Sequence, residues 1–380
     1  MNKLKKIFKQ KNIIRALTSA KIATVCLGLL FILTFCGTVY QIKYGLYPAQ
    51  EKFFNSFFFL IFNVIPFPGA HLVMWVLFVN LLSVLFFRFQ YTLKNLGILV
   101  IHIGIMTLLL SGFVTLHFSS ESNLSLFEGE GSNVTSAYHD WELAIWKEGS
   151  ARNDVVAVDA TELRIGKIYN FEEFGLTIFV KSFYANSQPF SSDANPIEKV
   201  INDSGIKYLE KVASSLDPTK NSPGGVFAVH DKKGTEFPVL LYGPENIPTQ
   251  IVLDGTWYHL QLRHKKFILP FVIKLIDFRM QKHPGTEVAK SFESTVEIET
   301  PQMTRETVIS MNNPLRYQDY TFYQASYAID PAKGEMSSLA VVRNTGRILP
   351  YVATIVTFLG LMLHFVMRFV MTLKREKNLK

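Results

Sequence analysis

The sequence has 380 residues, enough for more than one domain, and it is 48% hydrophobic with a formal net charge of +8. The N-terminal tail to Lys21, the turn 88–94 and the tail from Arg368 hold 14 basic residues and one acidic residue, whereas the rest holds 25 basic and 30 acidic residues. Basic residues beside apolar segments mark the cytoplasmic side of a membrane, so the charge does not indicate nucleic-acid binding. Cys26 and Cys36 form no CxxC or CxxCH motif, which argues against a thiol oxidoreductase and against covalently bound c-type haem.

Four apolar segments are long enough to cross a bilayer as helices, and they lie at 22–40, 72–89, 96–116 and 349–369. The flanking basic residues place both termini in the cytoplasm. The chain is therefore predicted to be a multi-pass protein of the inner (cytoplasmic) membrane, in contact with membrane lipid. Its membrane region comprises 1–117 and 347–380, and 118–346 form a domain on the periplasmic, extracytoplasmic side.

The external connection between the first two spans contains another apolar run, at 53–67, which is rich in phenylalanine. Pro66 and Pro68 interrupt it, and it is too short for a separate span. We therefore expect an interfacial or re-entrant helix in this segment.

The segment 118–346 contains short alternating runs such as ELAIW, VVAVDA and FVIKLIDF, with turn residues between them. One stretch, 196–216, has apolar residues at helical spacing and is stopped by Pro218. The predicted fold class is membrane α-helical, with four transmembrane helices, plus a large β-rich extracytoplasmic domain between the third and fourth spans. This domain is expected to be a sandwich or barrel with a helical insertion.

His102 lies inside the third span, where an ionisable side chain is costly and by default suggests a functional site. At about 100° per residue, the small residues Gly97, Gly104, Ser111 and Thr115 fall on the opposite face. Membrane helices approach one another closely through small residues, so we expect the helix to pack through that face and to offer His102 elsewhere. The residues leave two alternatives open, a ligand to a cofactor or a neutral histidine hydrogen-bonded to a neighbouring helix.

His364 lies in the fourth span, four residues before Arg368 and so about 6 Å from the inner end of its helix. His102 lies eight residues after Lys94, about 12 Å from the inner end, so two imidazoles at similar depth could hold one haem iron. The alternative is that His364 points toward water or lipid headgroups. The remaining histidines do not group into a metal site, and His259 and His264 are expected on opposite faces of one strand.

Several segments of the chain resemble one known family. They are IPFPGAHLVMWVLFVNLL and HIGIMTLLLSGFVT in the membrane region, LSLFEGEGSN after the third span, and LPFVIKLIDFRMQKHPGTEVAKSFESTVEI and MNNPLRYQDYTFYQASY before the fourth. Together they resemble ResB-type (CcsB-type) cytochrome c biogenesis proteins. The resemblance touches all four spans and both ends of the external domain, but not residues 185–225.

This resemblance implies a haem-handling subunit that works with a CcsA-type (ResC) multi-span membrane partner. Such a pair carries haem across the membrane and presents it to the CxxCH motif of apocytochrome c for covalent attachment. A histidine in the third span of the family is an axial haem ligand, and the matching position here is His102. The cargo would be haem b, bound transiently, and the family's second ligand is attributed to the partner, with His364 as the alternative within this chain.

Two further classes of protein compete with this interpretation. One is a membrane-anchored receptor or scaffold whose β-rich domain binds a protein partner without haem, with the histidines in structural roles. The other is a transporter, which is disfavoured because four spans without a visible inverted repeat make a poor pathway. Whether a ResB-type subunit counts as an enzyme is open, because the bond-forming step of a cytochrome c haem lyase (holocytochrome c synthase) belongs to the whole complex.

Overall fold

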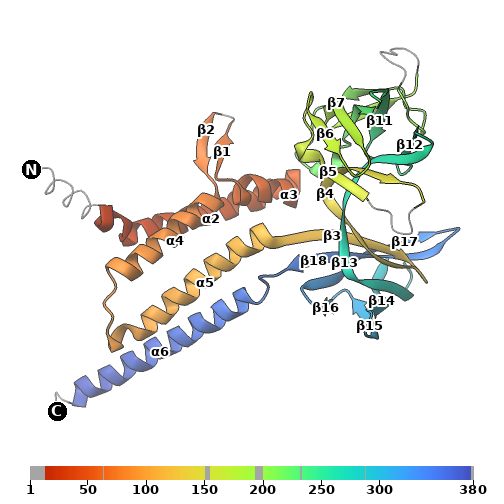
Figure 1. Cartoon of the computed structure of the whole chain (residues 1–380). Helices are drawn as coiled ribbons and strands as arrows, with labels where there is room; N and C mark the ends of the chain where they lie inside the picture. The colour runs from red at the N-terminus through yellow and green to blue at the C-terminus, as the bar shows by residue number, and fades with distance from the viewer. Residues whose placement is uncertain are drawn as a thin grey trace, which may run out of the picture. The chain divides into compact units, whose positions relative to one another are not determined.

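The structure is a computed structural model that describes residues 13–62, 64–149, 155–192, 200–231, 233–286 and 288–377. It divides into a helical unit, Met1–Ser120 with Arg343–Lys380, and a β unit, Glu121–Val342. Figure 1 shows the chain leaving α5 into the strands and returning from β18 into α6, so the β unit is inserted between the third and fourth long helices. The predicted fold class is confirmed.

Four helices in the described part of the chain are long and apolar enough to cross a membrane. They are α2 (Ala20–Tyr44), α4 (Ala70–Phe87), α5 (Leu96–Phe118) and α6 (Leu349–Lys377), and each overlaps one predicted span. Large apolar side chains point outward from them, and Phe31, Phe86 and Phe369 are 74%, 68% and 65% exposed. Such surfaces are compatible with lipid rather than water, so the protein is anchored in a membrane.

The closest helix packing in this unit is between α5 and α6, which run side by side in Figure 1. A Cβ atom added to Gly97 would lie 2.5 Å from the backbone nitrogen of His364, and one added to Gly104 would lie 2.7 Å from that of Thr357. Both positions therefore require glycine, because no side chain fits between the two backbones. The small face of the third span is confirmed as a packing face.

The prediction of a helix at 53–67 is wrong. After α3 (Leu46–Ala49) and a π-helical turn (Gln50–Asn55), the chain forms an antiparallel hairpin of β1 (Phe58–Ile61) and β2 (Ile65–Pro68). Aromatic and β-branched residues favour strands, and the prolines are tolerated because each strand pairs on one side only. The apolar residues Phe62 and Val64 near the tip are 90% and 76% exposed, as in a segment that meets lipid.

The β unit is built mainly from antiparallel pairs. Its described strands are β3 (Ser119–Phe127), β4 (Gly131–Lys147), β5 (Val155–Asp159), β6 (Ile168–Phe171), β7 (Leu176–Tyr184), β8 (Ser187–Phe190), β9 (Tyr208–Lys211), β10 (Gly224–His230), β11 (Glu236–Tyr242), β12 (Thr249–Leu253), β13 (Thr256–Lys282), β14 (Ala289–Glu299), β15 (Thr304–Ser310), β16 (Leu315–Tyr317), β17 (Tyr320–Asp330) and β18 (Gly334–Asn344). The largest sheet has the order β15-β14-β13-β4-β3-β18-β17-β16, with β12 beside β13 and β5 beside β4. A second sheet has the order β11-β10-β7-β6, and β8 pairs with β9.

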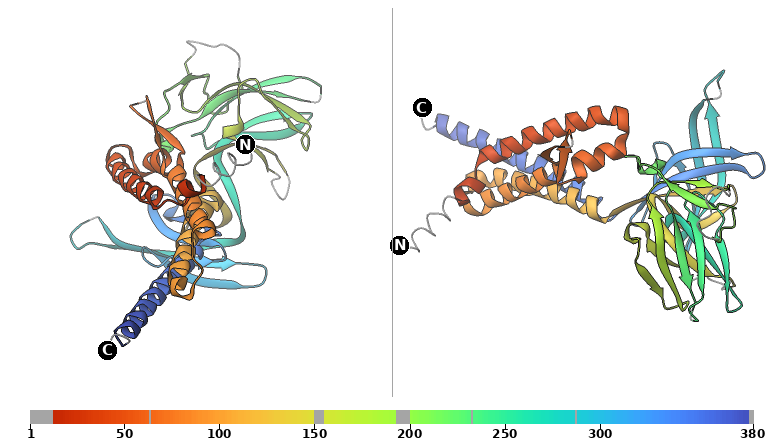
Figure 2. Two further views of the ribbon diagram at one scale, coloured as in Figure 1. Left: turned by 90° about the vertical axis from the view of Figure 1, so that its left-hand side faces the viewer. Right: turned by 90° about the horizontal axis from the view of Figure 1, so that it is seen from above.

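Two apolar cores stabilise the β unit, and β13 contributes to both. The first contains Leu260 of β13 with Phe227 of β10, and the second contains Ile273 of β13 with Phe322 of β17, all of them fully buried. Figures 1 and 2 show β13 as the long strand that joins the two parts of the unit. The 27 residues of β13 therefore form one continuous strand that takes part in both apolar cores.

The prediction of a helix at 196–216 is also wrong over its described part, 200–216. The rest of that prediction falls in 193–199, which lie outside the described residues. Ile201 forms an isolated bridge to Val239, and β9 pairs with β8. The side-chain oxygen of Asn202 accepts hydrogen bonds from the backbone N–H groups of Ser204 and Ile206, which stabilises a turn instead of a helix.

The segment TFYQASY contributes one member of a buried triad of hydrogen-bonded polar side chains. The side-chain oxygen of Gln324 accepts a hydrogen bond from Ser294 (2.7 Å), its Nε2 donates to Ser337 (2.9 Å), and the two serine hydroxyls are 2.7 Å apart. All three side chains are buried. Gln324 therefore fixes three strands of the second core and has a structural role.

Replacing Gln324 with leucine is expected to destabilise the β unit by about 1–3 kcal/mol, because two buried serine hydroxyls each lose a partner. Thermal unfolding of the full chain measures this loss. Adding Ser294→Ala and Ser337→Ala to the leucine variant should recover part of it, since no polar group is then left unsatisfied. A Gln324→Leu protein that melts at the wild-type temperature would contradict the structural role.

Candidate functional site

The candidate residue in the third span, His102, is half-buried on α5. Its Nδ1 lies 2.8 Å from the carbonyl oxygen of Ile98. A carbonyl can only accept, so Nδ1 carries the hydrogen and Nε2 keeps a free lone pair. The ring of Phe89 lies 6.4 Å away, between centroids. A histidine fixed in this tautomer by a backbone carbonyl is prepared to bind a metal through Nε2.

The second candidate, His364, lies in the contact between α6 and α5, with its backbone against Gly97. Its Nδ1 is buried, and no described residue hydrogen-bonds to it. His102 is five residues from Gly97, which is about 140° around α5 from the face that packs on α6. The structure therefore does not bring the imidazoles of His102 and His364 together. A shared iron between them stays a prediction that this packing does not favour.

The structure instead brings together two histidines at the opposite end of the spans, His71 and His117. Their ring centroids are 5.8 Å apart and the ring planes are inclined by 50°. His71 is in the first turn of α4, and His117 is in the last turn of α5. The sequence contained a signal for this pair, because antiparallel helices joined by a short turn place the start of one beside the end of the other.

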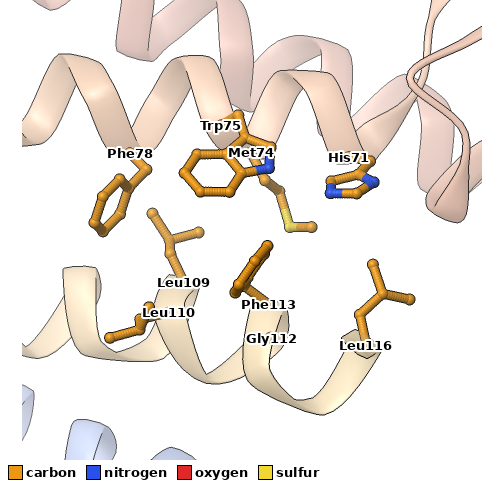
Figure 3. A pocket seen from close by; sticks show the side chains of 9 residues that line it. All are labelled: His71, Met74, Trp75, Phe78, Leu109, Leu110, Gly112, Phe113 and Leu116. Carbon is orange, nitrogen blue, oxygen red and sulfur yellow. The ribbon is translucent and has the colours of Figure 1, made fainter. Parts of the chain in front are cut away.

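An apolar groove begins at His71 and continues between α4 and α5 (Figure 3). About 420 Å³ of space not occupied by atoms lies along it, and part of this space is open to the surroundings. Its lining residues are His71, Met74, Trp75, Phe78, Leu109, Leu110, Gly112, Phe113 and Leu116. Figure 3 shows the rings of Trp75 and Phe113 approaching from opposite helices, and their centroids are 5.2 Å apart in an edge-to-face arrangement. The groove suits a flat apolar ligand.

Two histidines of β13 are arranged differently, because each stacks on a tryptophan of the neighbouring strand. The ring of His259 lies 5.4 Å from Trp146, and that of His264 lies 3.9 Å from Trp141. These pairs follow from the register of β13 against β4. In the described part of the chain, no three histidine, cysteine, aspartate or glutamate side chains gather into a metal site.

The environment of His264 predicts that the stability of the folded protein depends on pH. Burial lowers its pKa from the ordinary value, and the positive charge of Lys266 lowers it further. The unfolded chain therefore takes up a proton, at an ordinary pKa of about 6.5, more readily than the folded chain. The stability gained by keeping His264 neutral in the folded protein is complete above about pH 6.5 and is lost as the pH falls below it.

Replacing His264 with phenylalanine keeps an aromatic ring on Trp141 and removes the titration. The fall in melting temperature between about pH 8 and about pH 5 should then be smaller than in the wild type. An unchanged pH dependence would show that His264 does not resist protonation in the folded protein.

Comparisons with known proteins agree with the resemblance noted in the sequence. Residues 249–352 match the ResB-like family. The range extends from β12 to the first residues of α6, and it includes the buried triad of Gln324 but none of the histidines of α4 and α5. Protein NrfI of Wolinella succinogenes is 24% identical over 308 residues, which are 76% of this chain and 29% of NrfI. The chain thus spans less than a third of the length of that relative.

Proposed function

We propose, from the premise that the chain is a ResB-type protein, that it handles haem in cytochrome c biogenesis. In this proposal the chain binds haem b transiently as cargo and works with a CcsA-type (ResC) multi-span membrane subunit. The pair carries haem across the membrane and presents it to the CxxCH motif of apocytochrome c. The observation that carries the proposal is His102, whose Nδ1–H is held by the Ile98 carbonyl so that Nε2 is free for iron.

The chemistry of haem supports this assignment. Its macrocycle is flat and apolar, so it is stable beside an apolar helix surface, and its iron needs an axial ligand such as a neutral imidazole. His102 offers that ligand from the face of α5 that does not pack on α6. A neutral imidazole held in one tautomer can take and release iron without moving a proton, which suits cargo that has to leave again.

The division of labour in the proposed complex follows from what this chain contains. The helical unit supplies the haem ligand, and the β unit is the part large enough to guide the apocytochrome peptide. The second ligand of the His102 haem comes from the partner, because His364 lies on the α6 side of α5. Both termini lie in the cytoplasm in this proposal, and the bond between haem and thiol forms in the whole complex.

The proposal is tested by deleting the gene in its host and re-expressing the chain. Covalent haem in c-type cytochromes, detected by haem staining of denaturing gels, should disappear on deletion and return on re-expression. Haem and a multi-span membrane protein should copurify with the chain from detergent. Unchanged c-type cytochromes in the deletion strain would overturn the proposal and favour an anchored scaffold.

A further inference from the structure

We propose that a groove between α2 and α4 binds one anionic phospholipid, with the headgroup phosphate at Lys21 and an acyl chain along the groove. None of the residues that line this groove belongs to α5, which carries His102. The site needs a membrane but no haem, so it goes beyond the proposed function.

The groove lies between two helices that run side by side in Figure 1. Its lining residues are Lys21, Ile22, Val25, Cys26, Leu29, Pro68, Leu72, Val73 and Val76. About 640 Å³ of space not occupied by atoms lies along it, and part of this space is open to the surroundings. Lys21 is the one charged residue of the lining, and the side chain of Val25 is 61% exposed. An empty apolar groove would forfeit dispersion contacts, so an apolar chain is expected to fill it.

The length of the groove matches one leaflet of a bilayer. Lys21 and Leu29 are eight residues apart on α2, which is a rise of about 12 Å. The hydrocarbon core of a bilayer is about 30 Å thick, or about 15 Å per leaflet. An acyl chain that begins beside Lys21 can therefore lie along the groove for most of its leaflet.

Polar contacts fix the start of α2, and with it Lys21, against α4. The side chain of Asn80 donates to the carbonyl of Ser19 at 3.1 Å, and Nη1 of Arg88 donates to the carbonyl of Thr18 at 3.0 Å. Asn80 and Thr18 are buried. These bonds satisfy backbone carbonyls at the break in the helix just before α2. Lys21 lies in the first turn after this break, so its position at the end of the groove is preorganised.

The charge of Lys21 is not balanced within the helical unit. The segments 1–120 and 343–380 contain only two acidic residues, Glu51 and Glu376. Glu51 follows the opposite end of α2, and Glu376 is near the end of α6. No described residue forms an ion pair with Lys21. Basic residues between membrane helices attract anionic headgroups, so a lipid phosphate is the anion that the bilayer supplies here.

An anionic phospholipid satisfies both parts of the site. The stem of a lysine lies along an apolar surface while its ammonium group stays at the polar boundary, where it can donate to a phosphate. A helix of another protein would fill the groove but leave the ammonium group of Lys21 without an anion. A free phosphate would pair with Lys21 but leave the groove empty.

The test is native mass spectrometry of the full chain in a neutral detergent. The chain is titrated with dioleoyl phosphatidylglycerol or dioleoyl phosphatidylcholine, which have the same acyl chains and differ in net charge. The wild type should bind one phosphatidylglycerol more tightly than phosphatidylcholine by about tenfold or more, the strength of one charge-assisted hydrogen bond. Lys21→Gln should remove this preference, and Lys21→Arg should keep it. Equal affinity of the two lipids for the wild type would overturn the proposal.

Lys94→Gln is the matched control for the charge. Lys94 is an exposed lysine of the same helical unit, in the turn before α5, and it does not line the groove. This variant should keep the preference for phosphatidylglycerol. A loss in Lys94→Gln as large as that in Lys21→Gln would overturn the site, because the lipid would then respond to overall charge and not to one position.

The apolar part of the site is tested separately. Val25→Trp fills the groove and should weaken the binding of both lipids. Val39→Trp changes an exposed valine of α2 outside the lining, and it should bind both lipids as the wild type does. Unchanged phosphatidylglycerol binding in Val25→Trp would overturn the placement of an acyl chain in the groove. Displacement of the lipid by inorganic phosphate would overturn the lipid site in favour of a site for a free anion.

Discussion

Replacing His102 with asparagine is expected to abolish the maturation of c-type cytochromes and to leave the chain without the haem that copurifies with it from cells. Asparagine can still donate to the Ile98 carbonyl, so the local structure of α5 is kept, but the ligating Nε2 is gone. Loss of a group that only supports a ligand typically costs 10–100-fold in metal affinity, so loss of the ligand itself should cost more than about tenfold. The measurements are haem staining of c-type cytochromes and the Soret absorbance of the purified protein.

The His283→Asn variant, a change of an exposed histidine in the β unit, is the matched control and should mature cytochromes at the wild-type level. A His102→Asn strain with fully assembled c-type cytochromes would exclude His102 as the ligand.

The sequence was sufficient to predict the parts of the molecule that depend on repeated patterns. The four spans followed from apolar segments of bilayer length, and the β-rich unit followed from alternating runs. The packing face of α5 was predicted from Gly97 and Gly104, because small residues at helical spacing have one physical reason in a membrane. These predictions needed no knowledge of which distant residues meet.

The errors occurred where a local pattern had two solutions. The run at 53–67 is apolar enough for an interfacial helix, but Pro66 and Pro68 fit an edge strand equally well, and pairing with β1 decides the outcome. At 200–216 the helical spacing of apolar residues competed with the turn that Asn202 forms with its own backbone. Tertiary pairing overrode periodicity in both segments.

The candidate site was only half predictable for a related reason. A single histidine in a span, such as His102, is visible as a local exception to the apolar pattern. The pair of His71 and His117 depends on the antiparallel arrangement of α4 and α5, and the buried Nε2 of His71 depends on the Asn55 carbonyl, 16 residues away. Neither of these two contacts can be predicted from the spacing of residues along one helix.

The second large effect is expected at the contact between α5 and α6, where Gly104→Ala should lower stability more than an ordinary helix substitution. The added Cβ atom would lie 2.2 Å from Oγ1 of Thr357 and 2.7 Å from its backbone nitrogen. The hydroxyl can move but the backbone cannot, so the two helices have to separate. Overpacking of this kind costs about 1–3 kcal/mol, and Gly104→Leu should cost more because its larger side chain forces the helices further apart.

Gly112→Ala is the matched control, because Gly112 lies on the same helix and a Cβ atom there meets nothing within 4 Å. This variant should be neutral or slightly stabilising, since alanine favours a helix over glycine by about 1 kcal/mol. Melting temperatures in one detergent measure the difference. Thr357→Ala should rescue Gly104→Ala only in part, because it removes the hydroxyl contact and leaves the backbone contact. Equal melting of the Gly104 and Gly112 alanine variants would exclude the close packing of α5 on α6, and with it the reason why His102 is turned away from α6.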